Sequence, residues 1–299
     1  MKEIRMKALA KINLGLDVVR KREDGYHEVR MIMQTVKLYD QIDIHKMDKP
    51  GIRLKTNLQY LPVDENNLAY RAARLLIEEF GIPKGVSIRL RKVIPIAAGM
   101  AGGSSDAAAV LVGLNRIFQL GLTKQELMER SVKLGADVPY CILRGTALAE
   151  GIGEKLTRLP AMPKCHVLIA KPGIHVSTKM VYTNLRADEL VSHPDIDGQI
   201  AAIRERDLRR AAELMGNVLE TVTIPAYPVI GKIKEKMMAC GALGAMMSGS
   251  GPTVFGLFED EEKARYAYEK MRRGSLAKQV YLTRIMNHGG DANDRRFSD

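Results

Sequence analysis

The segment from residue 95 to residue 109 constrains the fold more than any other part of the chain. It reads PIAAGMAGGSSDAAA, a glycine-rich stretch that leads through two serines into alanines, which favour a helix. Upstream, Val86, Ile88 and Leu90 alternate with polar residues, as in a half-buried strand. We therefore expect the order strand, glycine loop and helix.

This order predicts an anion site. Gly99, Gly102 and Gly103 carry no Cβ atom, so we expect positive φ angles and N–H groups that approach a ligand closely. The helix start adds unpaired N–H donors and the positive end of the helix dipole. Ser104 and Ser105 are candidates to cap the helix or to contact phosphate. The pattern is neither a Walker loop nor a dinucleotide fingerprint, and a tight structural turn is the alternative interpretation.

Charge and length narrow the class of protein. The chain has 299 residues and a formal net charge of +11, from 46 Lys and Arg against 35 Asp and Glu. This length predicts two domains or one large domain. The positive charge favours phosphate-bearing ligands. Because the basic residues are dispersed and belong to no recognisable nucleic-acid module, we predict a small-molecule ligand and no nucleic acid.

The cysteines and the longest uncharged stretch indicate where the protein works. Three cysteines lie far apart without the paired spacing of a zinc site, which predicts a reduced protein of the cytoplasm. Residues 237–258 are uncharged and reach membrane-spanning length, but they contain five glycines and a proline. We expect a loop between buried elements there, and no membrane association.

The first half of the chain predicts strands followed by capped helices. Apolar and polar residues alternate over residues 7–19, as in a strand. Asn67 precedes apolar residues at helical spacing and is expected to cap that helix. Thr123 and Glu126 form a capping-box pattern, and the helix that they begin is expected to end before Asp137, which we place in a loop.

The second half predicts an α+β unit of its own. Pro160 and Pro163 flank a short spacer, so we expect a first domain of residues 1–158 and a second of residues 159–287. Residues 288–299 are polar and lack apolar periodicity, so we expect them to be disordered. The expected helices are residues 196–215, 229–238 and 260–273, and the expected strands are residues 167–170, 253–258 and 279–285.

Three separated segments together carry a family resemblance. They are residues 11–13 (KIN), the loop 95–105 and residues 247–253 (MSGSGPT). In this order and spacing, the chain resembles the GHMP small-molecule kinases over nearly its full length. The resemblance implies a two-domain α+β architecture, with an N-terminal domain like ribosomal S5 domain 2 and a ferredoxin-like C-terminal domain. It also implies an active site in the cleft between them.

The resemblance implies a catalytic pair. Asp137 is implied as the base or orienting carboxylate for the acceptor hydroxyl, with Lys11 beside it. Phosphoryl transfer needs a positioned hydroxyl and neutralised charge on the transferring oxygens, which a carboxylate and an ammonium supply together. Without the resemblance, Asp137 would be interpreted as a turn residue and Lys11 as a solvated lysine.

The resemblance further implies that ATP binds with its phosphates on the glycine loop and its adenine near Asn67. Met100 and Ala101 differ from the leucine and glycine common in the family, but neither change removes a backbone donor. We expect Mg²⁺ to accompany ATP, and the sequence shows no dedicated carboxylate cage for it, with Ser105 and Asp106 as candidate ligands only. The implied ATP-binding residues are Asn67, Pro95, Ile96, Ala97, Ala98, Gly99, Met100, Ala101, Gly102, Gly103, Ser104 and Ser105.

Two further segments indicate the substrate. Residues 21–27 (KREDGYH) and 135–139 (GADVP) are typical of family members whose substrate carries a cytidine diphosphate group. For those members the resemblance implies that cytosine stacks between aromatic side chains and bonds a histidine. The matching positions are Tyr26, His27 and Tyr182, and Asn13 is expected to touch the substrate.

Other interpretations stay open from the sequence. Tyr182 at helical spacing is also compatible with simple core packing, and His27 with a solvated turn. A kinase of the same family that acts on homoserine, mevalonate or a sugar needs no cytidine-binding aromatics. A non-catalytic nucleotide-binding relative would keep the fold and turn over no ATP. The expected activity is ATP-dependent phosphorylation of an alcohol linked to cytidine diphosphate.

Overall fold

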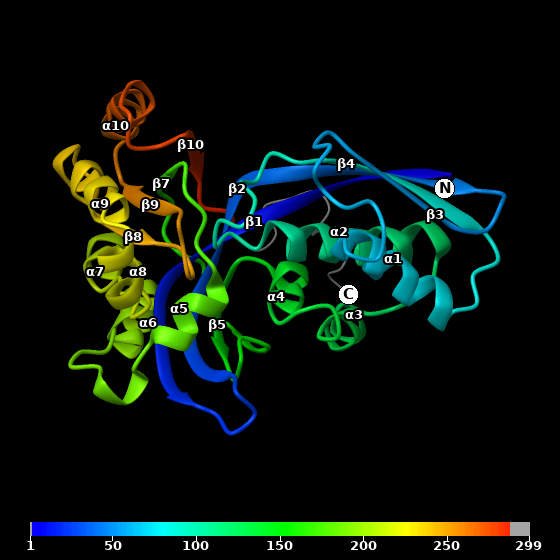
Figure 1. Ribbon diagram of the computed structural model, residues 1–299, viewed down its shortest axis with the longest axis horizontal. Coiled ribbons are helices and arrows are strands. Elements are labelled where there is room, and N and C mark those ends of the chain that lie inside the picture. The colour runs from blue at the N-terminus through cyan, green and yellow to red at the C-terminus, as the bar shows by residue number, and fades with distance from the viewer. Residues whose placement is uncertain (1, 288–299) are drawn as a thin grey trace.

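The computed structural model of the protein describes residues 2–287. The chain forms two β-sheets, each packed against helices, and Figure 1 shows the two bodies side by side. The α+β fold class expected from the sequence is confirmed. In the described part of the chain, no helix has both the length and the apolar character needed to cross a membrane.

The first sheet has the strand order β3-β4-β2-β5-β6, with β1 along the other edge of β2. Met6 and Ala8 of β1 and Ile42 and Ile44 of β2 are buried, while the polar residues between them face outward. This alternation is why the segments form strands with one covered face. The strands are β1 (Glu3–Lys21), β2 (His27–Met47), β3 (Ile52–Thr56), β4 (Gly85–Arg91), β5 (Thr146–Glu150) and β6 (Lys155–Arg158).

Four helices cover the buried face of this sheet. The Asn67 side chain caps the first by accepting from the N–H of Ala69 at 2.9 Å. Thr123 and Glu126 form the predicted capping box. Both predicted helix starts are therefore confirmed. The helices are α1 (Leu68–Glu79), α2 (Gly102–Phe118), α3 (Lys124–Ser131) and α4 (Asp137–Leu143).

The second sheet is antiparallel, with the strand order β10-β7-β9-β8 that a ferredoxin-like unit has. Its strands are β7 (His166–Lys171), β8 (Gly244–Met247), β9 (Val254–Phe258) and β10 (Gln279–Arg284). The accompanying helices are α5 (Thr178–Asn184), η1 (Ala187–Glu189), α6 (Ile196–Arg204), α7 (Leu208–Glu213), α8 (Glu220–Ala226), α9 (Val229–Ala239) and α10 (Glu261–Arg273).

The β1–β2 hairpin belongs to both bodies. Its strands curve from the first sheet toward the second in Figure 1. Ile12 and Leu14 pack in one core with Ile169 and Phe255 of the second sheet. The predicted domain boundary, between residues 158 and 159, falls between the end of β6 and the start of β7 and stays a prediction.

Three local predictions were wrong. Asp137 lies not in a loop but at the first position of α4. This helix tolerates Pro139 in its first turn, because N–H groups there have no acceptor within the helix and proline removes no helical hydrogen bond. The expected helix over 196–215 is broken between α6 and α7, where Arg206 has a φ of 61° and Asp207 caps the next helix. Residues 237–258 are no loop, since they contain β8 and β9.

Residues 288–299, predicted to be disordered, lie outside the described residues.

Candidate active site

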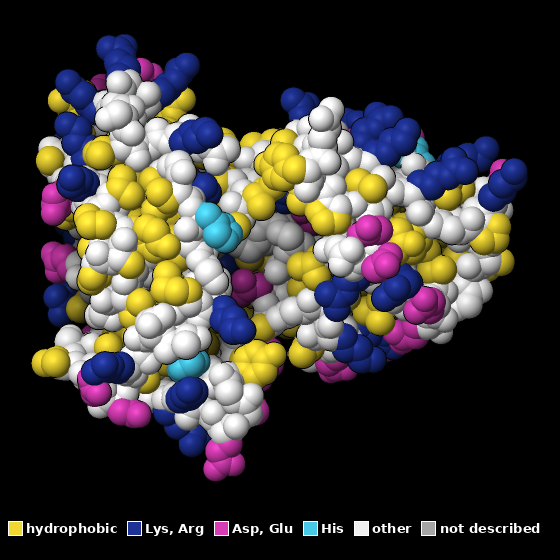
Figure 2. Space-filling model, viewed as in Figure 1, with side chains coloured by type: hydrophobic (Ala, Val, Ile, Leu, Met, Phe, Trp, Pro, Cys, Tyr) yellow, Lys and Arg dark blue, Asp and Glu magenta, His cyan; other side chains and the backbone are white. Residues whose placement is uncertain are grey.

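A cavity of about 930 Å³ opens between the two bodies, and Figure 2 shows the surface hollowed there. The first body contributes β1, the turn before β2, the glycine loop and the start of α4. The second contributes α5 and the turn between β8 and β9. The two bodies thus share the wall of one site. The predicted residues that line it are Lys11, Asn13, Tyr26, His27, Asn67, Pro95, Ile96, Ala97, Ala98, Gly99, Ala101, Gly102, Gly103, Ser104, Asp137 and Tyr182.

The glycine loop takes its left-handed backbone at unexpected positions. Gly99 has the predicted positive φ, at 71°, but Gly102 and Gly103 are the first helical residues of α2. Ala97 and Ala101 instead have φ angles of 48° and 53°. The prediction was wrong at Gly102 and Gly103 because the chain turns before them, at Ala101.

Gly99 is required by a close contact between the two bodies. A Cβ atom on Gly99 would lie 1.9 Å from the backbone oxygen of Ser248, and the Ser248 hydroxyl donates to the Gly99 oxygen at 2.9 Å. Asn217 supports the same turn by donating to the backbone oxygens of Met247 and Gly249, each at 2.8 Å. Two of the segments that carried the family resemblance therefore touch.

The two serines have different environments. Ser104 lines the cavity, whereas Ser105 is buried and its hydroxyl donates to the backbone oxygen of Leu9 at 2.5 Å. Neither caps α2, because the residue before the helix is Ala101, whose methyl group cannot accept a hydrogen bond. Met100 is also buried and lies outside the cavity lining described above. A contact of Met100 or Ser105 with ATP stays a prediction.

Lys11 and Asp137 both face the cavity. The Lys11 ammonium donates to Asn13 Oδ1 at 2.8 Å, and both side chains are buried. Asp137 lies one turn before Cys141 in α4. Burial raises the pKa of the Cys141 thiol, the charge of Asp137 raises it further, and the charge of Lys11 lowers it. Both charged groups therefore lie near this thiol and line the same cavity.

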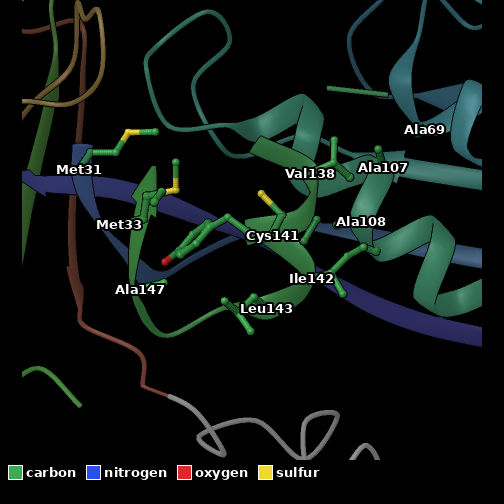
Figure 3. Packing of buried hydrophobic residues seen from close by; sticks show 14 of the residues in the cluster. Met31, Met33, Ala69, Ala107, Ala108, Val138, Cys141, Ile142, Leu143 and Ala147 are labelled. Atoms are coloured by element: carbon green, nitrogen blue, oxygen red, sulfur yellow. The ribbon is translucent and has the colours of Figure 1, made fainter. Parts of the chain in front are cut away.

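The position of Asp137 depends on how α4 packs. Figure 3 shows Val138, Cys141 and Ile142 of α4 facing Ala107 and Ala108 of α2. All five are buried. Alanines let the two helices approach closely, so α4 is fixed against the helix that begins at the glycine loop. The carboxylate and the loop are therefore held by one core.

An aromatic pair lies close to Asp137. The rings of His27 and Tyr182 are 5.2 Å apart between centroids and tilted by 42°. Burial and the charge of Lys21 lower the pKa of His27, so its ring is neutral at pH 7. Burial and the charge of Asp137 raise the pKa of Tyr182 to about 12. Tyr26, in contrast, is 61% exposed at the cavity rim.

A buried ion cluster beneath the glycine loop was missed from the sequence. The Lys92 ammonium bonds to carboxyl oxygens of both Asp40 and Asp106, the latter at 2.7 Å. The second oxygen of Asp40 accepts from the N–H of Ile94 at 2.8 Å. Sequence spacing gives no sign that β2, the end of β4 and α2 meet here. Lys92 and Asp106 also line the cavity.

Charge in this cluster is finely balanced. Burial works to lower the pKa of Lys92, but Asp106 and Asp40 together raise it, so the lysine stays charged. Burial raises the pKa of Asp106 well above the usual carboxyl value, against the opposite effect of Lys92. A single ammonium does not compensate two buried carboxylates, which is why one of them favours its protonated form.

Comparison with known families fits this geometry. Residues 67–145 match the family described as GHMP kinases N terminal domain, and residues 199–275 match GHMP kinases C terminal. The two sheets and the shared cavity with its glycine loop thus define a kinase of the GHMP class. A homoserine kinase from Cytophaga hutchinsonii has the same fold at 21% identity, with a TM-score of 0.77 and coverage of 95% of this chain and 94% of that one.

More similar proteins narrow the class. A 4-diphosphocytidyl-2-C-methyl-D-erythritol kinase from Lachnospira eligens is 58% identical over 95% of this chain and 98% of its own, and one from Caldicellulosiruptor bescii is 49% identical over 96% and 100%. A crystal structure of 4-(cytidine 5'-diphospho)-2C-methyl-D-erythritol kinase superposes with a TM-score of 0.82 at 34% identity, covering 94% of this chain and 99% of that one. The chain therefore belongs to the 4-diphosphocytidyl-2-C-methyl-D-erythritol kinase family, and the expected two-domain GHMP architecture is confirmed.

Proposed function

We propose that this protein transfers the γ-phosphoryl group of ATP to the 2-hydroxyl of 4-diphosphocytidyl-2-C-methyl-D-erythritol, a step of the non-mevalonate route to isoprenoid precursors. The observation that carries the proposal is the 58% identity, over 95% of the chain, to a kinase of that name. The shared cavity supports it, because a carboxylate, an ammonium, a glycine loop and an aromatic pair all line it.

In the proposed mechanism, Asp137 accepts the proton of the attacking hydroxyl and fixes its direction. Lys11, held by Asn13, offsets negative charge on the transferring oxygens. The first-turn N–H groups of α2 bind phosphate oxygens, since they have no partner within the helix. Asn67 lies beside the adenine while its side chain caps α1. The phosphoryl group passes directly to the alcohol, without a phosphoenzyme.

ATP is proposed to bind with Mg²⁺. Within residues 2–287, no group of three or more His, Cys, Asp or Glu side chains is arranged to hold a metal ion. The chain instead offers the hydroxyl oxygen of Ser104 at the cavity wall, an oxygen donor of the kind Mg²⁺ accepts. We propose that ATP phosphates and water supply the remaining ligands, and that the ion offsets phosphate charge.

The aromatic pair supports a cytidine substrate over other acceptors. We propose that cytosine stacks on Tyr26 and Tyr182 and bonds the neutral His27, which offers one donor and one acceptor. Acceptors such as homoserine and mevalonate present no base to these rings.

The three cysteines carry free thiols, which fits a proposed location in the reducing cytoplasm.

A direct assay tests the proposal. The purified protein is mixed with ATP, Mg²⁺ and 4-diphosphocytidyl-2-C-methyl-D-erythritol, and the product is followed by ³¹P NMR. We expect ADP and a new phosphomonoester on the 2-hydroxyl. Homoserine, mevalonate and galactose serve as competing acceptors. Turnover of one of these, with none of the cytidine compound, contradicts the proposal.

A further inference from the structure

Asp40, Lys92 and Asp106 form a cluster of charged side chains beside the glycine loop. Lys92 lies between the end of β4 and the glycine loop, and Asp106 lies in α2 just after it. The contact between their side chains therefore joins the two ends of the loop. Asp40, from β2, bonds Lys92 and the N–H of Ile94, which fixes the strand from which the loop departs.

The cluster leaves two groups without partners. An ammonium has three N–H donors, and Lys92 uses two of them on Asp40 and Asp106, while the described residues supply no third acceptor. Asp106 Oδ1 is buried and has no hydrogen-bond partner among residues 2–287. Unpaired buried polar groups are costly, so the open N–H of Lys92 beside a cavity indicates a ligand that accepts from it. Asp106 Oδ1 could bond to the same ligand only in the protonated form, in which it donates.

The position of the Lys92 ammonium points to an anion. A Cβ atom on Gly102 would lie 3.3 Å from Lys92 Nζ, so the ammonium lies against the first residue of α2. There the positive end of the helix dipole and the lysine charge face the same space. The helix start and the open N–H donor of Lys92 therefore favour a ligand oxygen that carries negative charge.

The other lysines that line the cavity lie on other elements. Lys11 bonds Asn13, and the charge of Lys21 acts on His27. Lys179 lies in α5, within one turn of Tyr182. Of these lysines, Lys92 is the one whose ammonium lies against Gly102, the first residue of α2.

We propose that Lys92 donates its third N–H to a phosphate oxygen of the bound nucleotide, and that Asp40 and Asp106 are positioning residues that aim it. This inference rests on the proposed function only in taking ATP as the ligand. The raised pKa of Asp106 is consistent with it, because a protonated Asp106 removes the excess negative charge that would repel phosphate.

The role of Lys92 is tested by measuring the dissociation constants of ATP and of adenosine by titration calorimetry. Lys92→Met should weaken ATP binding about 10- to 100-fold, the usual effect of losing a hydrogen bond from a charged group, and leave adenosine binding within twofold. Lys55→Met, an exposed lysine on β3, removes the same charge far from the cavity and should change neither. Unchanged ATP affinity, or an equal loss for adenosine, overturns the proposal.

Asp106 variants test the positioning role. Asp106→Ala should weaken ATP binding as Lys92→Met does, whereas Asp106→Asn, which keeps an acceptor for Lys92, should restore most of the affinity. The double variant Lys92→Met/Asp106→Ala should be no weaker than Lys92→Met alone, since both changes remove one interaction. Additive losses contradict an action of Asp106 through Lys92.

A measurement on the unaltered protein covers the case in which Lys92→Met does not fold. The ¹⁵Nζ resonance of the protected Lys92 ammonium should shift on adding ADP and stay in place on adding adenosine. No shift with ADP overturns the proposal. These binding tests need no phosphoryl acceptor, so they are independent of the proposed function. If ATP binding depends on Lys92 but the protein does not phosphorylate the cytidine substrate, only the proposed function is contradicted.

Discussion

At the scale of single residues, Ala97 and Ala101 hold a backbone region that L residues avoid. Their φ angles of 48° and 53° cost about 1–2 kcal/mol each relative to a right-handed residue. Such strain persists only where surrounding contacts impose it. Here the contact of Gly99 with Ser248 and the start of α2 leave the loop little freedom.

Ala101→Gly should therefore stabilise the protein. Relief of the strained φ exceeds the added entropy of a glycine in the unfolded chain, and a net gain of about 0.5–1 kcal/mol is expected. Urea unfolding measures it. Ala109→Gly, inside α2, is the control and should lose about 1–2 kcal/mol, from the helix propensity of glycine and the loss of a buried methyl group. Equal losses in both variants would show that Ala101 is not strained.

Asp137→Asn should lower kcat by about 10²–10⁴ and change KM for the alcohol little, because it removes the proton acceptor and keeps the shape. Steady-state kinetics with the cytidine substrate measure both constants. Combined with Lys11→Ala, the loss should be smaller than the product of the single losses if the two groups act as a unit. Near-normal turnover by the Asp137→Asn variant would contradict the proposed role of Asp137 as proton acceptor.

Tyr26→Ala should weaken binding of the cytidine substrate about 5- to 150-fold, from the loss of about 1–3 kcal/mol of stacking. Tyr26→Phe should recover most of this loss, since stacking needs the ring. Because Tyr26 is largely exposed, neither change should lower stability or ATP affinity. Tyr266→Ala, an exposed tyrosine of α10, is the control. Unchanged affinity in both Tyr26 variants would exclude cytosine stacking at this position.

Asp106 should make stability depend on pH. Its pKa is raised by burial, so the folded protein holds a proton that the unfolded chain releases above pH of about 4. The stabilisation is complete below that value and is lost as pH rises through the raised pKa. Asp106→Asn cannot ionise and should gain stability relative to the unaltered protein over this range. Parallel curves of melting temperature against pH would contradict the raised pKa.

At the scale of elements, the contact between the glycine loop and the β8–β9 turn distinguishes two glycines. Gly99→Ala places a Cβ atom 1.9 Å from the Ser248 oxygen at a φ of 71°, and we expect a loss of at least about 1–3 kcal/mol in stability. Gly103→Ala meets only Leu68 Cδ1, at 3.5 Å, in a helical conformation, so stability should change little. Thermal unfolding of both variants checks this, and similar losses would contradict the asymmetry.

Elements with local signals were predicted well, and those set by distant contacts were not. Asn67 and the Thr123–Glu126 pair mark helix starts because their caps involve residues two or three positions away. The placement of Asp137 at the start of α4 depends instead on packing against α2. Most proposed site residues come from the glycine loop and its family resemblance. The Lys92 cluster joins three elements, so no short pattern could reveal it.

At the scale of the whole molecule, the β1–β2 hairpin ties the two bodies together. Arg30 of β2 forms two bonds, of 2.6 and 2.8 Å, with Asp197 of α6, and Leu16 bridges to Asn217. Leu16 also lines the cavity. The aromatic pair shows the same division, since His27 begins β2 and Tyr182 belongs to α5. The site therefore exists only when both bodies are assembled.

This arrangement sets the order of events during synthesis. Leu14 and Phe255 share one core although roughly 240 residues separate them, and a ribosome adding about 5–20 residues per second needs on the order of 12–50 s to cover that distance. Throughout that time the hairpin side chains that pack on the second sheet lack their neighbours from β9. Nascent chains should therefore depend on chaperones that shield the first strands until the last third of the protein emerges.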